Sequence, residues 1–173
     1  MSFLSRIFGA PRGEDRLLPL YRRIVEIGRS PDWYREGEVP DTLQGRFDII
    51  AALLALLLLR LERDEAAKAE SVRLTEIFID DMEGTVRQIG IGDLMVGKHV
   101  GKMMSALGGR LAAFRAVAAG EREMDEAVRH NIFHDSPPSQ AAVAFVAARL
   151  AQFQAALEAR SNDAILAGEV PAP

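Results

Sequence analysis

Apolar residues recur along this chain at every third or fourth position, which is the spacing of amphipathic helices. Runs of β-branched residues and hairpin turns, the signals of strands, are scarce. Prolines, glycines and capping residues divide the helical pattern, and a short turn holds Trp33 and Tyr34. We expect helices at about 15–27, 42–63, 65–89, 93–119, 123–132 and 139–160.

The most apolar stretch is the run IIAALLALLLL at 49–59. These eleven residues would span roughly 17 Å as a helix, against about 30 Å of hydrocarbon in a membrane. A helix that is apolar on every side is typical of the buried centre of a bundle. Because the connections are short, neighbouring helices should be antiparallel. We predict an all-α fold, a single antiparallel helical bundle of about six to seven helices around a buried central apolar helix.

The ends of the chain look different from this core. Residues 1–12 are too short and too weakly apolar for a secretory signal, and Phe3, Leu4, Ile7 and Phe8 suit one or two amphipathic turns. Such turns are either a packed or frayed end of the chain or an anchor on a membrane surface. We therefore expect an N-terminal amphipathic segment at 1–12, a helical domain at 13–160 and a loose tail at 161–173.

The segment 93–117 is the most organised helical pattern, because it sorts into three stripes. One stripe is apolar: Val96, Val100, Met103, Met104, Leu107, Leu111 and Phe114. A second consists of small residues: Gly97, Gly101, Ser105, Gly108 and Ala112. The third is a basic edge: Lys98, His99, Lys102 and Arg110. Each interior glycine weakens a helix by roughly 1 kcal/mol relative to alanine, so a close approach by another chain or helix is indicated.

Small residues at this spacing allow another helix backbone to come close. The approaching helix is either a neighbour within the bundle or a helix of a partner protein. In the second case Lys98 and Lys102 flank the strip and bind acidic or anionic-lipid groups. Met103 and Met104 suit either a core or an adaptable apolar surface.

The charge distribution makes this helix unusual. The chain has a net charge of −4, which does not favour nucleic acid, and we expect no DNA partner. Residues 93–120 carry four basic groups and one acidic group, so they are a basic island in an acidic protein. The absence of cysteine excludes disulfides and thiol chemistry and suits a reducing compartment.

Two clusters carry residue types that could perform chemistry. Asp80, Asp81 and Glu83 resemble the aspartate-rich helical motifs that hold magnesium, but the spacing differs and no second motif follows. His130 and His134 have a spacing that can bind zinc, yet no third ligand follows at a fixed distance. A solvated or partner-facing acidic face and surface histidines are the favoured interpretations. We predict no catalytic residue, no metal and no cofactor.

Five segments of the chain form a recognisable combination of motifs. They are LYRRIV at 20–25, DWY at 32–34, VPDTLQGRFD at 39–48, FIDDME at 78–83 and GDLMVGKHVGKM at 92–103. Together they resemble the ubiquinol–cytochrome c chaperone family over about residues 16–155. The combination of the segment at 39–48 with the segment at 92–103 is fairly specific.

The resemblance implies a non-enzymatic assembly chaperone. Members of this family bind newly made cytochrome b and support assembly of respiratory complex III, and the mitochondrial members act with a small partner protein near the ribosomal exit. This chain lacks the long N-terminal extension of mitochondrial members and resembles a bacterial version. The expected partners are therefore cytochrome b or another complex III subunit, the ribosome exit region and a small co-chaperone. We expect a cytoplasmic protein with peripheral contact to the inner face of the cytoplasmic membrane.

A chaperone that holds membrane helices needs apolar or small-residue surface together with charged edges. The striped helix and the acidic patch supply both. We expect the partner-binding residues to be Asp80, Asp81, Glu83, Lys98, His99, Lys102 and Arg110.

Two other classes of function stay open from the sequence. One is a helical, magnesium-dependent enzyme or binding protein for prenyl diphosphates that uses Asp80 and Asp81. The other is a membrane-surface adaptor that uses the apolar side chains of residues 3–8.

Overall fold

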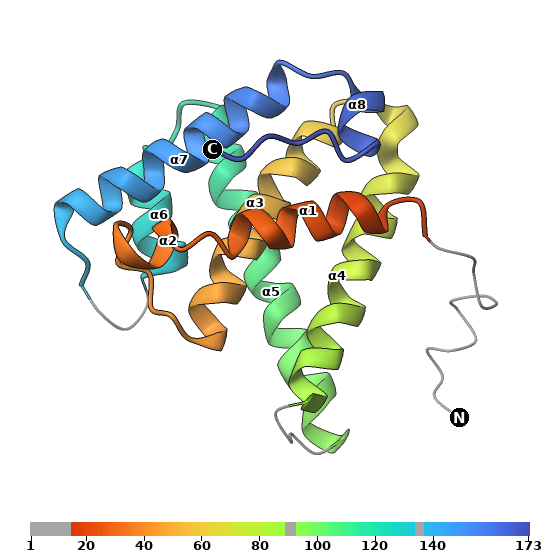
Figure 1. Cartoon of the computed structure of the whole chain (residues 1–173), viewed down its shortest axis with the longest axis horizontal. Coiled ribbons are helices and arrows are strands. Elements are labelled where there is room, and N and C mark those ends of the chain that lie inside the picture. The colour runs from red at the N-terminus through yellow and green to blue at the C-terminus, as the bar shows by residue number, and fades with distance from the viewer. Residues whose placement is uncertain (1–14, 89–92, 134–136) are drawn as a thin grey trace.

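The computed structural model of this chain describes residues 15–88, 93–133 and 137–173, and these residues form helices and no strand. Figure 1 shows their arrangement as an all-helical bundle, which confirms the predicted fold class. The elements are α1 (Leu18–Gly28), α2 (Asp32–Arg35), α3 (Leu43–Leu61), η2 (Glu65–Ala67), α4 (Lys68–Gln88), α5 (Asp93–Ala118), α6 (Met124–Ile132), α7 (Gln140–Glu158) and α8 (Asn162–Leu166).

Helix α3 is the buried centre of the bundle, as its uniformly apolar sequence predicts. It packs against α1, α4, α5, α6 and α7, and Ile49, Leu53 and Leu57 are completely inaccessible to solvent. Among the helices that the structure describes, none combines the length and apolar character needed to cross a membrane. The apolar run at 49–59 therefore forms core, with other helices in place of lipid around it.

The segment before α3 is shaped by packing. The Thr42 hydroxyl caps the helix by accepting a hydrogen bond from the Gly45 amide at 3.1 Å, and Arg46 pairs with Asp41 at 2.7 Å. A Cβ on Gly45 would lie 2.0 Å from the Pro40 carbonyl oxygen, so this close turn excludes any larger residue. Several residues of the VPDTLQGRFD segment are thus explained by the local fold.

The expectation of a loose C-terminal tail at 161–173 is wrong. Helix α8 begins at a serine cap, and Ile165 and Val170 are 0% and 3% exposed. Arg23 of α1 donates a hydrogen bond to the Val170 carbonyl at 2.9 Å, and Arg60 of α3 donates one to the Asn162 side chain at 2.7 Å. These two apolar anchors and two polar contacts attach the tail to the bundle. Residues 1–12, the predicted amphipathic segment, lie outside the described residues.

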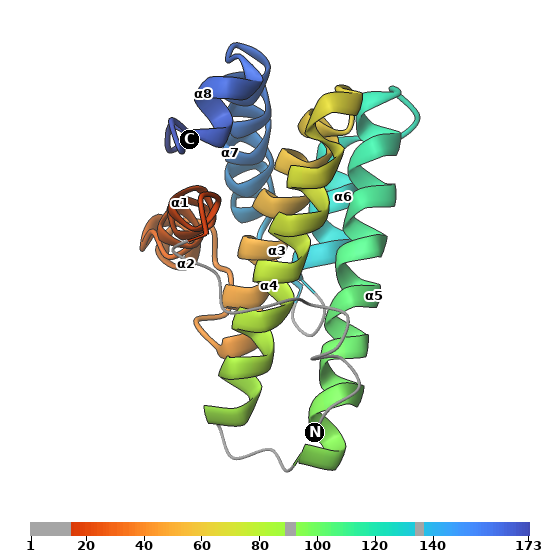
Figure 2. The same cartoon turned by 90° about the vertical axis from the view of Figure 1, so that its right-hand side faces the viewer.

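Helices α4 and α5 form a hairpin that extends past the rest of the bundle. In Figures 1 and 2, the end of α4 and the beginning of α5 continue below the lower end of α3. The opposite half of α5 lies against α3, α4 and α6. Helix α5 therefore has a packed C-terminal half and a projecting N-terminal half, and the projecting half is where the candidate site lies.

Candidate functional site on helix α5

The apolar stripe of α5 faces the bundle, as its sequence pattern predicts. Val96, Leu107 and Phe114 are 3%, 2% and 1% exposed. The intervening Met103 and Met104 are half-buried and pack at the margin of the core. This stripe fixes the rotation of α5, and with it the direction in which the other two stripes point.

The strip of small residues faces solvent along its whole length. Gly97, Gly101, Ser105, Gly108 and Ala112 are all exposed. A Cβ built on Gly97, Gly101 or Gly108 would meet no described atom within 4 Å. The interpretation of this strip as a contact between the described helices of the bundle is therefore wrong, and no packing among the described residues explains the glycines.

The basic edge flanks this open strip on the projecting half of α5. Lys98 and Lys102 are exposed, and neither forms an ion pair within the part of the chain that the structure describes. His99 is half-buried, and its Nδ1 lies 3.0 Å from the Met95 carbonyl oxygen. Met95, one turn earlier, is 44% exposed. The projecting half thus combines open backbone, two free ammonium groups and an exposed thioether.

Arg110 does not belong to this edge, and its expected place among the partner-binding residues is wrong. It is 1% exposed and donates hydrogen bonds to the Asp48 carboxylate of α3 and the Asn131 carbonyl at the end of α6. Its guanidinium also lies 5.5 Å from the centre of the Phe47 ring. Burial lowers the pKa of Arg110, and the neighbouring Asp48 carboxylate offsets part of that effect. Arg110 anchors α5 to the bundle.

The acidic residues lie on another surface. Asp80 and Asp81 line a groove between α1 and α4, and no residue of α5 lines that groove. The Tyr21 hydroxyl donates a hydrogen bond to Asp81 at 2.7 Å, and Glu83 pairs with Arg87 at 2.7 Å. Asp80 and Asp81 therefore line a groove to which Lys98 and Lys102 do not contribute, whereas the sequence predicted one site that contains all four residues.

Metal binding receives no structural support in the described ranges. No group of three or more His, Cys, Asp or Glu side chains is placed there to hold an ion. Burial raises the pKa of Asp80, and the Arg73 guanidinium lowers it in part. His130 is exposed, and His134 lies outside the described residues.

Fold and surface together define an all-helical protein with an open, glycine-rich face on α5. The comparisons with known proteins then identify the family. The model of the ubiquinol-cytochrome C chaperone family matches residues 35–172, so the chain belongs to this family, as its motifs predict. The chain is also similar to the Cbp3 homolog from Brucella abortus, with a TM-score of 0.79 and 27% identity over 91% of this chain and 88% of that chain. The search among curated proteins finds no match.

Proposed function

We propose that this protein is a non-enzymatic assembly chaperone that binds newly made cytochrome b and supports assembly of the ubiquinol–cytochrome c reductase complex. Membership of the ubiquinol-cytochrome C chaperone family supports this role. The structural observation that carries it is the open glycine strip on α5, because no contact in the described bundle accounts for it.

The strip suits a membrane helix as its occupant. Membrane helices associate through small residues that let two backbones approach closely, since hydrophobic burial contributes little between helices in lipid. The strip from Gly97 to Ala112 covers fifteen helical steps, roughly 22 Å, which is most of the hydrocarbon thickness that a client helix would span. A client helix could therefore contact α5 along most of its apolar length.

The free lysines suit the ends of such a client. Lys98 and Lys102 lie in the first three turns of α5, on its projecting half, where they could pair with acidic loop residues or with anionic lipid groups next to the client. Electrostatic pairing of this kind fixes orientation and speeds encounter more than it adds affinity. In this proposal the glycines hold the helix and the lysines set its direction. Contacts with the ribosome exit region and with a small co-chaperone remain predictions.

The test is a double charge reversal, Lys98→Glu with Lys102→Glu, followed by co-purification of cytochrome b with the tagged protein from cells. We expect less cytochrome b, with unchanged helix content by circular dichroism. The matched control is Lys68→Glu, because Lys68 is exposed on α4 and pairs with Glu65, three residues earlier. Capture that stays at the native level in the folded double variant would refute the proposed site.

A further inference from the structure

A second concave surface lies where α1 crosses α4, away from the strip on α5. Its volume is about 1190 Å³, and it opens to solvent along α1. A helix of three turns, about 16 Å long and about 10 Å wide, has a volume of about 1300 Å³. The groove between α1 and α4 is thus of the size of a short helix.

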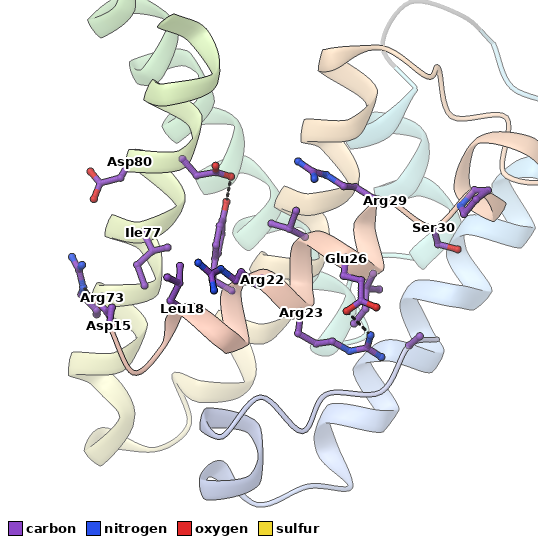
Figure 3. Close-up of a pocket in the computed structure, with 16 residues that line it drawn as sticks. Asp15, Leu18, Arg22, Arg23, Glu26, Arg29, Ser30, Arg73, Ile77 and Asp80 are labelled. Carbon is purple, nitrogen blue, oxygen red and sulfur yellow. Dashed lines mark hydrogen bonds and ion pairs between the residues drawn. The ribbon is translucent and has the colours of Figure 1, made fainter. Parts of the chain in front are cut away.

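The middle of this groove is apolar. Leu18 and Val25 of α1 are partly buried against the core, and Ile77 of α4 is 7% exposed beside them. On α1 the positions 18, 22, 25 and 29 share one helix face, so the apolar residues alternate with two arginines. Figure 3 shows Leu18 and Arg22 on α1 and Arg29 directly after it, with Ile77 and Asp80 on α4.

The free charges on the two walls have opposite signs. Arg22 and Arg29 of α1 are exposed and form no ion pair with any described residue. Asp80 of α4 is exposed and likewise unpaired within the described chain. Asp81, beside it on the same wall, is also exposed and accepts a hydrogen bond from the Tyr21 hydroxyl at 2.7 Å. Other lining charges pair with one another, with Arg23 on Glu26 at 2.9 Å and Arg73 on both Glu76 and Asp15. The groove therefore has a basic wall on α1 and an acidic wall on α4.

We propose that this groove binds an amphipathic helix of a partner protein, with its apolar side on Leu18, Val25 and Ile77. Acidic side chains of that helix lie over Arg22 and Arg29, and basic side chains lie over Asp80. A lone phosphate or an anionic lipid surface fits less well, because the carboxylate of Asp80 would repel it. Opposite charges on the two walls also fix the direction of the bound helix. This inference stands independently of the proposed client surface on α5.

The probes are three stapled peptides of roughly eleven residues, which is three helical turns, sharing one leucine stripe. One peptide has glutamates along one flank and lysines along the other, the second has glutamates on both flanks, and the third has lysines on both. Fluorescence anisotropy with the full chain should show that the mixed peptide binds about tenfold more tightly than either of the others. Equal binding of all three peptides, or no binding of the mixed peptide, would overturn the proposal.

Charge variants test whether the charges on the two walls of the groove determine which peptide binds most tightly. Arg22→Glu with Arg29→Glu makes both walls acidic and should transfer the preference to the lysine peptide. Asp80→Lys with Asp81→Asn removes both carboxylates from the α4 wall, makes both walls basic and should transfer the preference to the glutamate peptide. Arg35→Glu, an exposed change outside the groove, should leave the order unaltered. If these substitutions leave the order of peptide binding unchanged, the proposed walls of the groove are wrong. If the chain forms a dimer and the substitutions dissociate it, a second copy of the chain occupies the groove, which would also contradict the proposal.

Position can be checked with thiols, since the chain has no cysteine. A Val25→Cys variant should form a disulfide with a cysteine-bearing mixed peptide, and Val72→Cys should not. Val72 is the matched control because it is 57% exposed and lies on α4 outside this groove. Equal trapping at both positions would place the peptide elsewhere and overturn the proposal.

Discussion

Two sets of glycines in this protein have opposite surroundings. A Cβ on Gly28 would lie 2.7 Å from the Ile50 side chain, and one on Gly45 would lie 2.0 Å from the Pro40 carbonyl oxygen. A Cβ on Gly97 or Gly101 would have no atom of the described residues within 4 Å. The first pair is required by packing, whereas the second weakens its helix and makes no compensating contact with the described residues. The difference separates residues that the fold explains from residues that need another explanation.

The same contrast, between residues that pack inside the fold and residues that are open to solvent, separates two of the segments that resemble the family. The segment at 39–48 builds the turn, the cap and the start of the central helix, and its last residue, Asp48, is buried on Arg110. The described part of the segment at 92–103 lies on the projecting half of α5 and turns Gly97 and Gly101 to solvent. One segment therefore maintains the fold, and the other is available to a partner.

The largest effect should come from Arg110, at the boundary between the packed and projecting halves of α5. Arg110→Ala would leave the Asp48 carboxylate buried without its cation, and we expect a loss of about 3–5 kcal/mol in the free energy of unfolding. Urea denaturation measures this loss. The double variant Asp48→Leu with Arg110→Met should recover most of it, because removing both charges of a buried pair is often nearly neutral. A loss below about 1 kcal/mol in the single variant would show that Arg110 does not anchor the helix.

The second largest loss of stability is expected for Gly45→Ala. The added methyl group collides with a backbone carbonyl that cannot rotate away, so we expect the free energy of unfolding to fall by about 2–3 kcal/mol. The urea midpoint of the purified variant is the measurement, and Gly97→Ala is the matched control. A Gly45→Ala protein that unfolds at the native urea concentration would remove the distinction between packed and open glycines.

On the open face of α5, substitution of glycine by alanine should stabilise the protein instead of destabilising it. Gly97→Ala and Gly101→Ala should each raise the free energy of unfolding by about 0.5–1 kcal/mol, because alanine is the better helix former and the space is empty. The same pair of substitutions should weaken capture of cytochrome b by keeping the partner backbone at a greater distance. If both variants destabilise the protein, the strip has an internal role after all.

The sequence predicted the helices and the central position of α3 well, because apolar spacing reports burial directly. It also separated the stripes of α5, since angular positions around a helix follow from residue number alone. It could not say whether the small-residue strip faces the bundle or solvent, because that depends on which neighbouring helix supplies a partner surface.

Arg110 was misplaced for a related reason. Its charge suggested an exposed basic edge, although at about 100° per residue it lies only about 20° from Met103 and about 80° from Lys102. Its partner Asp48 is also distant in sequence. A lone aspartate in the apolar α3 segment was the available signal, since a buried carboxylate needs a partner. The tail was missed because its two buried residues, Ile165 and Val170, stand among polar and small residues without a helical period.

The central claim, that the open face of α5 holds the client, is best tested by site-specific crosslinking. The chain has no cysteine, so Ser105→Cys, within the strip, can carry a benzophenone maleimide, with Ala141→Cys on the exposed side of α7 as control. We predict that light crosslinks newly made cytochrome b to the probe at 105 and not to the probe at 141. Crosslinking that is equal at the two positions, or found only at 141, would contradict the account.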